Sequence, residues 1–262
     1  MVYQVSQVAR NEFAERGFTI LDGVIDDTWL TALREECAYF IGYIDSYMDA
    51  KGLDVQGITH RGKRYFISGR YRKSNRLADF LFGDLMAQVT RAFLGDSVYL
   101  FHEQWVVKGA EQGMKFAWHQ DSGYVNFRDP GNTHKPYLTC WCALDDMSAE
   151  NGTISVMPHD SQNTRARVLE HQQEAGTNDL IGYEGGESGD LLDMPAGSIA
   201  AFSSTSLHRS GENSTSHTRR VYLAQYSSER IVSTGGELWS QGVPFVANGN
   251  NIYSKEEDFA ND

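Results

Sequence analysis

The sequence predicts an α+β protein whose core is a double-sheet or barrel-like β structure. Apolar residues recur at helical spacing in much of residues 1–95. After Gly95 they gather in short runs rich in β-branched and aromatic residues, separated by clusters of Gly, Asn, Asp, Ser and Pro that are typical of turns. Helices followed by many short strands favour this class over a fold in which helices and strands alternate.

The N-terminal part is expected to be a mainly helical support. Residues 5–16 predict a short helix that leads into the strand-like segment GFTILDGV. Asp26 or Asp27 is suited to cap the next helix, because a carboxylate at this position accepts a hydrogen bond from the first turn. A further helix is expected over residues 77–94, ending before a glycine.

The β core is expected over residues 96–230, with a C-terminal extension over residues 231–262. The clearest strand candidates are VYLFHEQWVVKG, PYLTCWCAL, GTISVM, GSIAAF and RRVYLAQYS. No linker composition and no internal repeat interrupts the chain, so we expect a single domain over residues 1–262.

Composition excludes several functions. The chain has 262 residues, 40% of them hydrophobic, which suits a packed core. A net charge of -12 argues against nucleic acid as a partner, because phosphate binding needs clustered Lys and Arg. The sequence shows no extended basic patch for a membrane surface and no run of about 18 apolar residues to span a bilayer. We expect a small-molecule substrate, and the oligomeric state stays open.

The cysteines and the N-terminal segment point to a reducing compartment. Cys37, Cys140 and Cys142 cannot form a disulfide framework without leaving one over, so reduced buried thiols are expected. The segment MVYQVSQVARNEF lacks the basic and then apolar stretches of a signal peptide. The sequence therefore predicts a soluble, cytoplasmic protein.

The segment FAWHQDSGYV places His119 and Asp121 two residues apart. On a strand such residues point to the same side, so an imidazole and a carboxylate can reach one ion. A second histidine from another strand would complete a facial triad with open positions for a co-substrate and O2. His208 is the best candidate, because it follows the expected strand GSIAAF. The other loop histidines are expected to be solvated: His134, His159, His171 and His217.

Arginines open the last expected strand, RRVYLAQYS. A dicarboxylate co-substrate needs a fixed cation for its far carboxylate, and a guanidinium supplies two parallel hydrogen bonds. Only one of Arg219 and Arg220 can face the interior of a strand. The pattern alone leaves the choice between them even.

Together these residues resemble the phytanoyl-CoA dioxygenase family of Fe(II)/2-oxoglutarate oxygenases. The shared elements are W-H-Q-D at 118–121, A-L-D-D with E-N-G-T within 143–153, G-S-I-A-A-F at 197–202 and H-R-S-G-E-N-S at 208–214. The opening segment GFTILDGVID is also similar, so the resemblance runs from about residue 12 to residue 228. One departure is VMPHDSQN, where many members carry a Pro-Gly-Ser-His run, so no role is transferred to His159.

The resemblance implies a double-stranded β-helix, or jelly roll, with supporting helices. It implies Fe(II) held by His119, Asp121 and His208, with 2-oxoglutarate and O2 as co-substrates and no catalytic residue beyond the metal ligands. Related halogenases replace the carboxylate ligand by a small residue, so Asp121 favours oxygen transfer over halogenation.

The resemblance also assigns the co-substrate pocket. It favours Arg219 over Arg220 for the distal carboxylate of 2-oxoglutarate, with Ser210 assisting and Trp141 lining the pocket. Lys108 stands where the family often carries a lysine, so it is expected to contact the co-substrate.

Strand alternation extends these assignments to the substrate. Tyr137 and Thr139 share a side of their strand with the pocket tryptophan, and His102 and Gln104 share a face with the pocket lysine. These polar and aromatic groups favour an oxygenated natural product over a plain lipid chain. We therefore expect hydroxylation or oxidative cyclisation as a tailoring step of secondary metabolism, such as antibiotic biosynthesis, on a hydroxylated or glycosylated scaffold.

Some alternatives stay open at this point. A catalytically silent cupin-like protein would keep the fold and bind a small molecule, and a Zn or Mn cupin-type enzyme would use the same ligands for other chemistry. An acyl-CoA substrate would need a cationic entry, and the basic stretch over residues 61–73 is expected to be a solvated face instead. The loops 122–136 and 160–189 are expected to cover the pocket.

Overall fold

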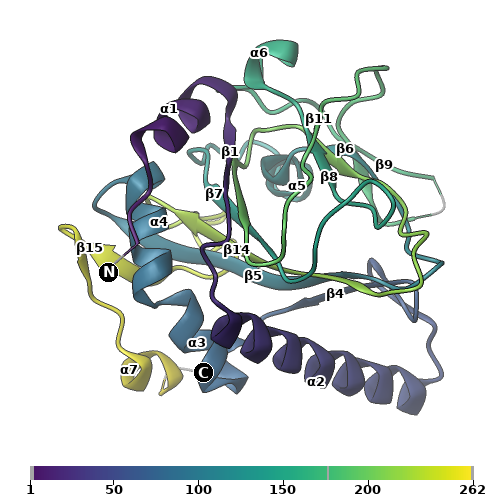
Figure 1. Cartoon of the computed structure of the whole chain (residues 1–262). Coiled ribbons are helices and arrows are strands. Elements are labelled where there is room, and N and C mark those ends of the chain that lie inside the picture. Colours follow the sequence, from purple (N-terminus) through teal and green to yellow (C-terminus); the bar gives the residue numbers. More distant parts are fainter. Residues whose placement is uncertain (1–2, 176, 261–262) are drawn as a thin grey trace.

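The structure of the chain is a computed structural model, which describes residues 3–175 and 177–260. It contains a larger and a smaller antiparallel sheet whose facing sides enclose part of the core (Figure 1). Helices from the N-terminal part cover the outer side of the larger sheet. The α+β class with a jelly-roll core is therefore confirmed, and of the two β arrangements expected, the double-sheet form is present.

The helices mostly follow the sequence pattern. They are α1 (Gln7–Arg16), α2 (Asp27–Lys51), η1 (Tyr71–Lys73), α3 (Asn75–Leu81), α4 (Asp84–Leu94), α5 (Asp121–Arg128), α6 (His159–Gln162) and α7 (Lys255–Phe259). Asp26 caps α2, since its carboxylate accepts a hydrogen bond from the backbone N–H of Trp29 at 2.9 Å. Within the described part of the chain, no helix combines the length and hydropathy that crossing a membrane requires.

The single helix expected over residues 77–94 is wrong. The segment forms α3 and α4, which are separated by Phe82 and Gly83. A Cβ atom at Gly83 would lie 2.6 Å from the carbonyl oxygen of Asp79, closer than any side chain allows. Glycine therefore permits a tight turn that hydrophobic periodicity does not reveal.

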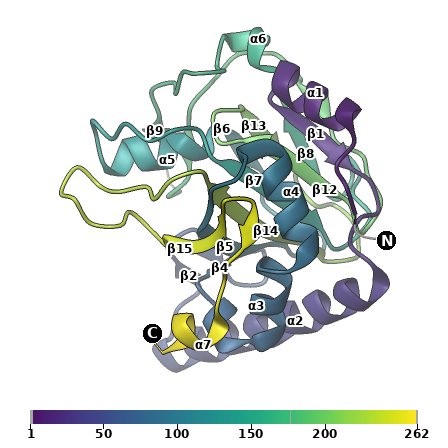
Figure 2. The ribbon, with the colours of Figure 1, turned by 90° about the vertical axis from the view of Figure 1, so that its left-hand side faces the viewer.

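The larger sheet joins distant parts of the chain. Its strands in order are β1 (Phe18–Leu21), β12 (Ile199–Ser203), β7 (Leu138–Ala143), β14 (Arg219–Ser227), β5 (Val98–Lys108), β4 (Arg64–Ser68), β3 (Thr59–His60) and β2 (Val55–Gln56). The C-terminal β15 (Val243–Ala247) pairs with β5, and β16 (Asn250–Asn251) pairs with β15 (Figure 2). The part expected to be mainly helical thus also supplies strands β1 to β4.

The smaller sheet carries two histidines of interest. Its order is β11 (Asp190–Leu191), β8 (Ile154–Val156), β13 (His208–Ser210) and β6 (Phe116–His119). A separate hairpin of β9 (Gln172–Gln173) and β10 (Leu180–Ile181) lies in the segment that was expected to be a covering loop.

Strand β7 shows how the two layers of the core are built. Cys140 and Cys142 belong to the cluster that includes the buried residues of α2, α3 and α4. The alternate residues Trp141 and Ala143 belong to the cluster between the two sheets. Because both faces of β7 are buried, the strand is apolar except for Thr139 and does not alternate with exposed polar residues. The cysteines are free and buried, as predicted.

The basic stretch at residues 61–73 is only partly a solvated face, which corrects the expectation. Arg64 is 1% exposed and pairs with Asp179 through two hydrogen bonds of 2.6 and 2.9 Å. Asp179 directly precedes β10, so this pair joins the β9–β10 hairpin to strand β4. The geometry satisfies a guanidinium that burial would otherwise leave unpaired.

Replacing Asp179 with Ala is expected to lower the free energy of unfolding by about 3–5 kcal/mol, because it leaves a buried guanidinium without its counter-ion. Urea unfolding measures the effect. Asp49→Ala is the matched control, since it removes the partner of Arg61 in an ion pair whose side chains are 34% and 62% exposed. A loss for Asp179→Ala no larger than that of the control would contradict a stabilising role for the buried pair.

Candidate metal centre

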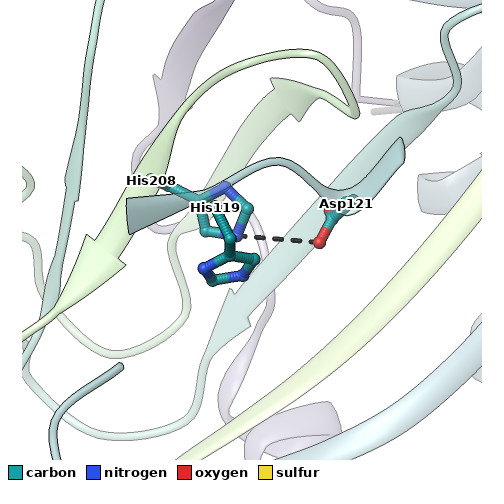
Figure 3. Close-up of side chains that lie close together, drawn as sticks. All are labelled: His119, Asp121 and His208. Carbon is teal, nitrogen blue, oxygen red and sulfur yellow. Dashed lines mark ion pairs between the residues drawn. The ribbon is translucent and has the colours of Figure 1, made fainter. Parts of the chain in front are cut away.

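Three side chains from separate elements meet at one end of the smaller sheet (Figure 3). His119 ends β6, His208 begins β13, and the two residues are direct partners across the antiparallel pair. Asp121 begins α5, and its Oδ1 lies 3.6 Å from Nε2 of His208. Potential ligand atoms of all three residues lie within 4.8 Å of one another.

The route by which Asp121 joins the histidines differs from the expectation. His119 and Asp121 do not share a strand, because β6 ends at His119 and Gln120 is the N-cap of α5. The side chain of Gln120 donates to the carbonyl oxygens of Arg167 and Thr205, and its backbone N–H donates to Nε2 of His171. These contacts with other segments hold the start of α5, and they cannot be read from two-residue spacing.

Each imidazole is oriented by a backbone carbonyl group two residues before it in the chain. Nδ1 of His119 donates to the carbonyl oxygen of Ala117 at 2.8 Å, and Nδ1 of His208 donates to that of Ser206 at 3.1 Å. The Nε2 atoms are therefore left with a free lone pair toward the site. Burial, with a smaller contribution from His208, lowers the pKa of His119 well below its usual value, which favours the neutral ring that binds metal.

The carboxylate is oriented in a similar way. Oδ2 of Asp121 accepts hydrogen bonds from Oγ1 of Thr139 at 2.5 Å and from Nε2 of Gln225 at 2.9 Å. The other oxygen, Oδ1, faces the histidines. Two neutral nitrogens and one carboxylate oxygen, each fixed by an outer hydrogen bond, form a donor set that fits a divalent metal with open positions.

A cavity of about 60 Å³ lies on one side of the three residues. Trp141, Ser210, Lys108 and Arg219 all line it, together with His119, Asp121 and His208. The structure thus brings the expected co-substrate residues together with the expected metal ligands. Arg64 lines it as well and was not foreseen as a site residue.

Cationic side chains form a row across three strands of the larger sheet. Lys108 on β5 is opposite Arg219 on β14 and opposite Arg64 on β4. All three are almost fully buried. Nζ of Lys108 donates to Oγ of Ser210 at 2.8 Å and to the carbonyl oxygen of Gly211. Burial, reinforced by the charges of Arg219 and Arg64, lowers the pKa of Lys108.

Arg219 lacks a counter-ion in this row. It is 1% exposed, and its guanidinium lies 5.3 Å from the ring of Trp141. Nη2 donates to the carbonyl oxygen of Gly152 at 3.3 Å, but Nε and Nη1 have no acceptor among the described residues. Burial lowers the pKa of Arg219 to about 9, although the charge of Asp145 opposes this effect. A buried, incompletely bonded guanidinium fits an anionic group of a ligand.

The neighbouring arginine has a different setting. Arg220 donates to the carboxylate of Asp145 at 2.5 and 3.0 Å, and its side chain is partly exposed. Arg219 therefore lines the cavity and Arg220 does not, in agreement with the family resemblance, which favours Arg219.

A second cavity, of about 160 Å³, also borders the metal centre. His119 and Asp121 border both cavities, and so does Gln104. His102 and Tyr137 line the second cavity, where they were expected to contact substrate. Thr139 is not among its lining residues, because its hydroxyl donates to Asp121 instead.

Several residues at the site were missed from the sequence. Gln225 is on the same face of β14 as Arg219 and opposite Thr139, so strand alternation from Arg219 could have indicated it. Arg64 gave no such signal, because the pairing of β4 with β5 cannot be read from the sequence. His159 and His171, which were expected to be solvated, are buried at 4% and 8% exposure.

The model of the phytanoyl-CoA dioxygenase (PhyH) family matches residues 13–221, most of the chain. The chain belongs to the phytanoyl-CoA dioxygenase family. This confirms the resemblance carried by the W-H-Q-D and H-R-S-G-E-N-S motifs, both of which lie within the matched residues.

The chain is also similar to a hydroxylase and to solved structures. L-proline trans-4-hydroxylase of Streptomyces griseoviridis is 27% identical over 158 residues, which cover 54% of this chain and only 58% of that protein. EvdO2 from Micromonospora carbonacea var. aurantiaca, complexed with 2-oxoglutarate, has a TM-score of 0.64 and 21% identity over 86% of this chain and 92% of its own. The epimerase SnoN, in complex with Fe3+, alpha ketoglutarate and nogalamycin RO, has a TM-score of 0.60 and 16% identity over 93% and 96%. These two structures show the same fold.

Replacing Thr139 with Val or Gln225 with Ala is expected to weaken metal binding by about 10- to 100-fold, because Asp121 loses a hydrogen bond that orients it. Competition with a chelator measures the affinity for Mn(II) or Fe(II). The matched control is Thr153→Val, since this buried hydroxyl donates to the carbonyl oxygen of Leu192 and not to the site. Unchanged affinity in both site variants would show that their contacts with Asp121 do not orient the carboxylate.

Proposed function

We propose that this protein is a non-haem Fe(II)/2-oxoglutarate-dependent oxygenase that hydroxylates or oxidatively cyclises a small molecule in natural-product biosynthesis. The observation that carries the proposal is Arg219, a buried guanidinium with two unbonded nitrogens in a cavity bordered by two histidines and a carboxylate. A binding module without catalytic activity has no need of both features. Membership of the phytanoyl-CoA dioxygenase family supports the same reading.

His119, Asp121 and His208 would hold Fe(II). When bound together with 2-oxoglutarate, Fe(II) supplies O2 activation coupled to oxidative decarboxylation, which yields succinate, CO2 and an oxidant for a C–H bond. The backbone carbonyl groups of Ala117 and Ser206 fix the histidine tautomers. Thr139 and Gln225 hold one carboxylate oxygen of Asp121, so that the other remains free as the ligand atom.

The cationic row would bind 2-oxoglutarate. Arg219 offers Nε and Nη1 to the distal carboxylate, and Trp141 provides a flat wall beside the guanidinium. The hydroxyl of Ser210 is fixed by Nζ of Lys108 and can assist at the same carboxylate. An anion between these groups offsets the desolvation of two buried cations, so the pocket selects for negative charge.

The second cavity would hold the substrate. It meets the co-substrate cavity at His119 and Asp121, so a bound molecule can place a C–H bond beside the metal. Its walls include many aromatic side chains, which exclude water from the reacting centre. The named ligand of SnoN, nogalamycin RO, and the hydroxylase among the relatives support a tailoring reaction on a ring-bearing natural product.

Arg219→Gln is expected to raise the Kd for 2-oxoglutarate by about 100-fold or more, since a buried charge-assisted pair contributes roughly 3 kcal/mol. Arg219→Lys keeps the charge but loses the two parallel hydrogen bonds, so an intermediate Kd is expected. Calorimetry with Mn(II) under anaerobic conditions measures binding. Arg220→Gln is the control, because Arg220 pairs with Asp145 away from the cavity. An equal loss in both glutamine variants would contradict the assignment of Arg219.

Asp121→Ala is expected to abolish Fe(II)-dependent conversion of 2-oxoglutarate to succinate, because the metal loses its anionic ligand. Succinate and O2 consumption are measured with added Fe(II), and circular dichroism checks that the variant is folded. Undiminished turnover would overturn the ligand assignment. If the unaltered protein shows no 2-oxoglutarate-dependent O2 consumption with any of a varied set of substrates, the oxygenase proposal itself fails.

A further inference from the structure

We propose that the second cavity binds a ring-bearing substrate with a single carboxylate, and that Arg128 at its mouth binds that carboxylate. The inference rests on the proposed function for the reaction at the metal, and it adds the chemical class of the substrate.

The walls of the cavity suit the flat face of a ring. Aromatic side chains from both sheets, α5 and the C-terminal segment line it: Phe66, Phe101, Phe116, Tyr124, Tyr137 and Trp239. Phe101 and Tyr137 have ring centroids 4.7 Å apart, and Phe101 and Trp239 have centroids 5.9 Å apart. Such walls favour stacking and edge contacts with a cyclic body. A volume of about 160 Å³ admits a small ring system rather than a large glycoside.

Helix α5 joins the metal centre to the mouth of the cavity. Asp121 is its first residue and Arg128 is its last. Seven steps at about 1.5 Å rise per residue separate the two positions by roughly 10 Å along the helix axis. Arg128, Tyr124 and Ile58 also line an open depression of about 350 Å³ on the outer side, so these residues mark the entrance.

The charge of Arg128 is not matched within the protein. Among residues 3–175 and 177–260, its guanidinium makes no ion pair or hydrogen bond, and its side chain is exposed at the entrance. Arg64 and Arg220, by contrast, are paired with Asp179 and Asp145. The only acidic residue among those that line the cavity is Asp121, which belongs to the metal centre. An acidic group of the ligand is therefore the natural partner of Arg128.

The remaining polar groups of the cavity fit a neutral part of the same ligand. Burial, assisted by the charge of Arg128, lowers the pKa of His102, which favours its neutral ring. Gln104 lines the cavity beside it and offers an amide. Among the residues that the structure describes, Arg128 is the only arginine or lysine that lines either the cavity or its outer depression. One cation matches one carboxylate, whereas the phosphates of a CoA thioester would need a cluster.

The test uses hydrocinnamate and hydrocinnamamide as probes, because they share a ring and differ in charge. Calorimetry measures the Kd of each for the full chain, with and without Zn(II) and 2-oxoglutarate. The acid is expected to bind about tenfold more tightly than the amide, since an ion pair at a cavity mouth is partly screened. Arg128→Gln is expected to remove this preference, and Arg128→Lys to keep part of it.

Arg10→Gln is the matched control. Arg10 lies on α1, is exposed, and has a side chain without a hydrogen-bond or ion-pair partner in the described part of the chain, so its replacement removes the same charge far from the cavity. Equal affinity for the two probes, no binding of the acid, or a preference that survives Arg128→Gln would overturn the inference. Failure of the proposed function would be recognised by a different result, namely that 2-oxoglutarate does not bind and no succinate forms. The preference for the acid over the amide can be measured whether or not 2-oxoglutarate binds.

Discussion

The pairing of β13 with β6 is the constraint on which the site depends. It sets His208 directly opposite His119, and this pairing holds the two imidazoles of the proposed metal centre side by side. A one-residue slip would turn one imidazole to the other side of the sheet. The pairing of β13 with β6 shifts register between His208 and Ser210, whereas the pairing of β13 with β8 on its other edge runs from His208 to Ser210 without a shift and opposes such a slip. The smaller sheet thus serves as a frame for two ligands.

A second constraint is the burial of positive charge between the sheets. Arg64, Lys108 and Arg219 lie in one row across β4, β5 and β14, but they are neutralised to different degrees. Within the described residues, Arg64 has Asp179 as its counter-ion, Lys108 has only uncharged hydrogen-bond acceptors, and Arg219 retains two unbonded nitrogens. Of the three cations, Arg219 is therefore the one whose charge and hydrogen-bond donors are least satisfied by the protein. The fold tolerates this arrangement because its apolar layers on both faces of β7 supply stability elsewhere.

The sequence was sufficient for the fold class, which follows from its helical and strand patterns, and for naming the residues that meet at the centre, which follow from motifs in one order. The strand alternation that was invoked for His119 and Asp121 was wrong, since Asp121 begins α5. The sequence was insufficient wherever a contact joins segments that no local pattern relates. The start of α5 at Asp121 depends on contacts of Gln120 with Thr205 and His171, and the burial of Arg64 depends on Asp179. The break at Gly83 could not be predicted for another reason: two short helices and one long helix show the same spacing of apolar residues.

Helix α5 has a consequence for how this active site can change. Its backbone hydrogen bonds fix the rise per residue, so the span between Asp121, the proposed metal ligand at one end, and Arg128 at the other is a property of helix length. Point substitutions on the helix alter the chemistry along that span but leave the span unchanged. With a substrate bound as proposed, between the metal and Arg128, a substrate of different length would require an inserted or deleted turn, and losing one turn would shorten the span by about 5 Å. Selectivity for the length of a substrate would thus change through insertions or deletions in the helix, and selectivity for its charge through point substitutions.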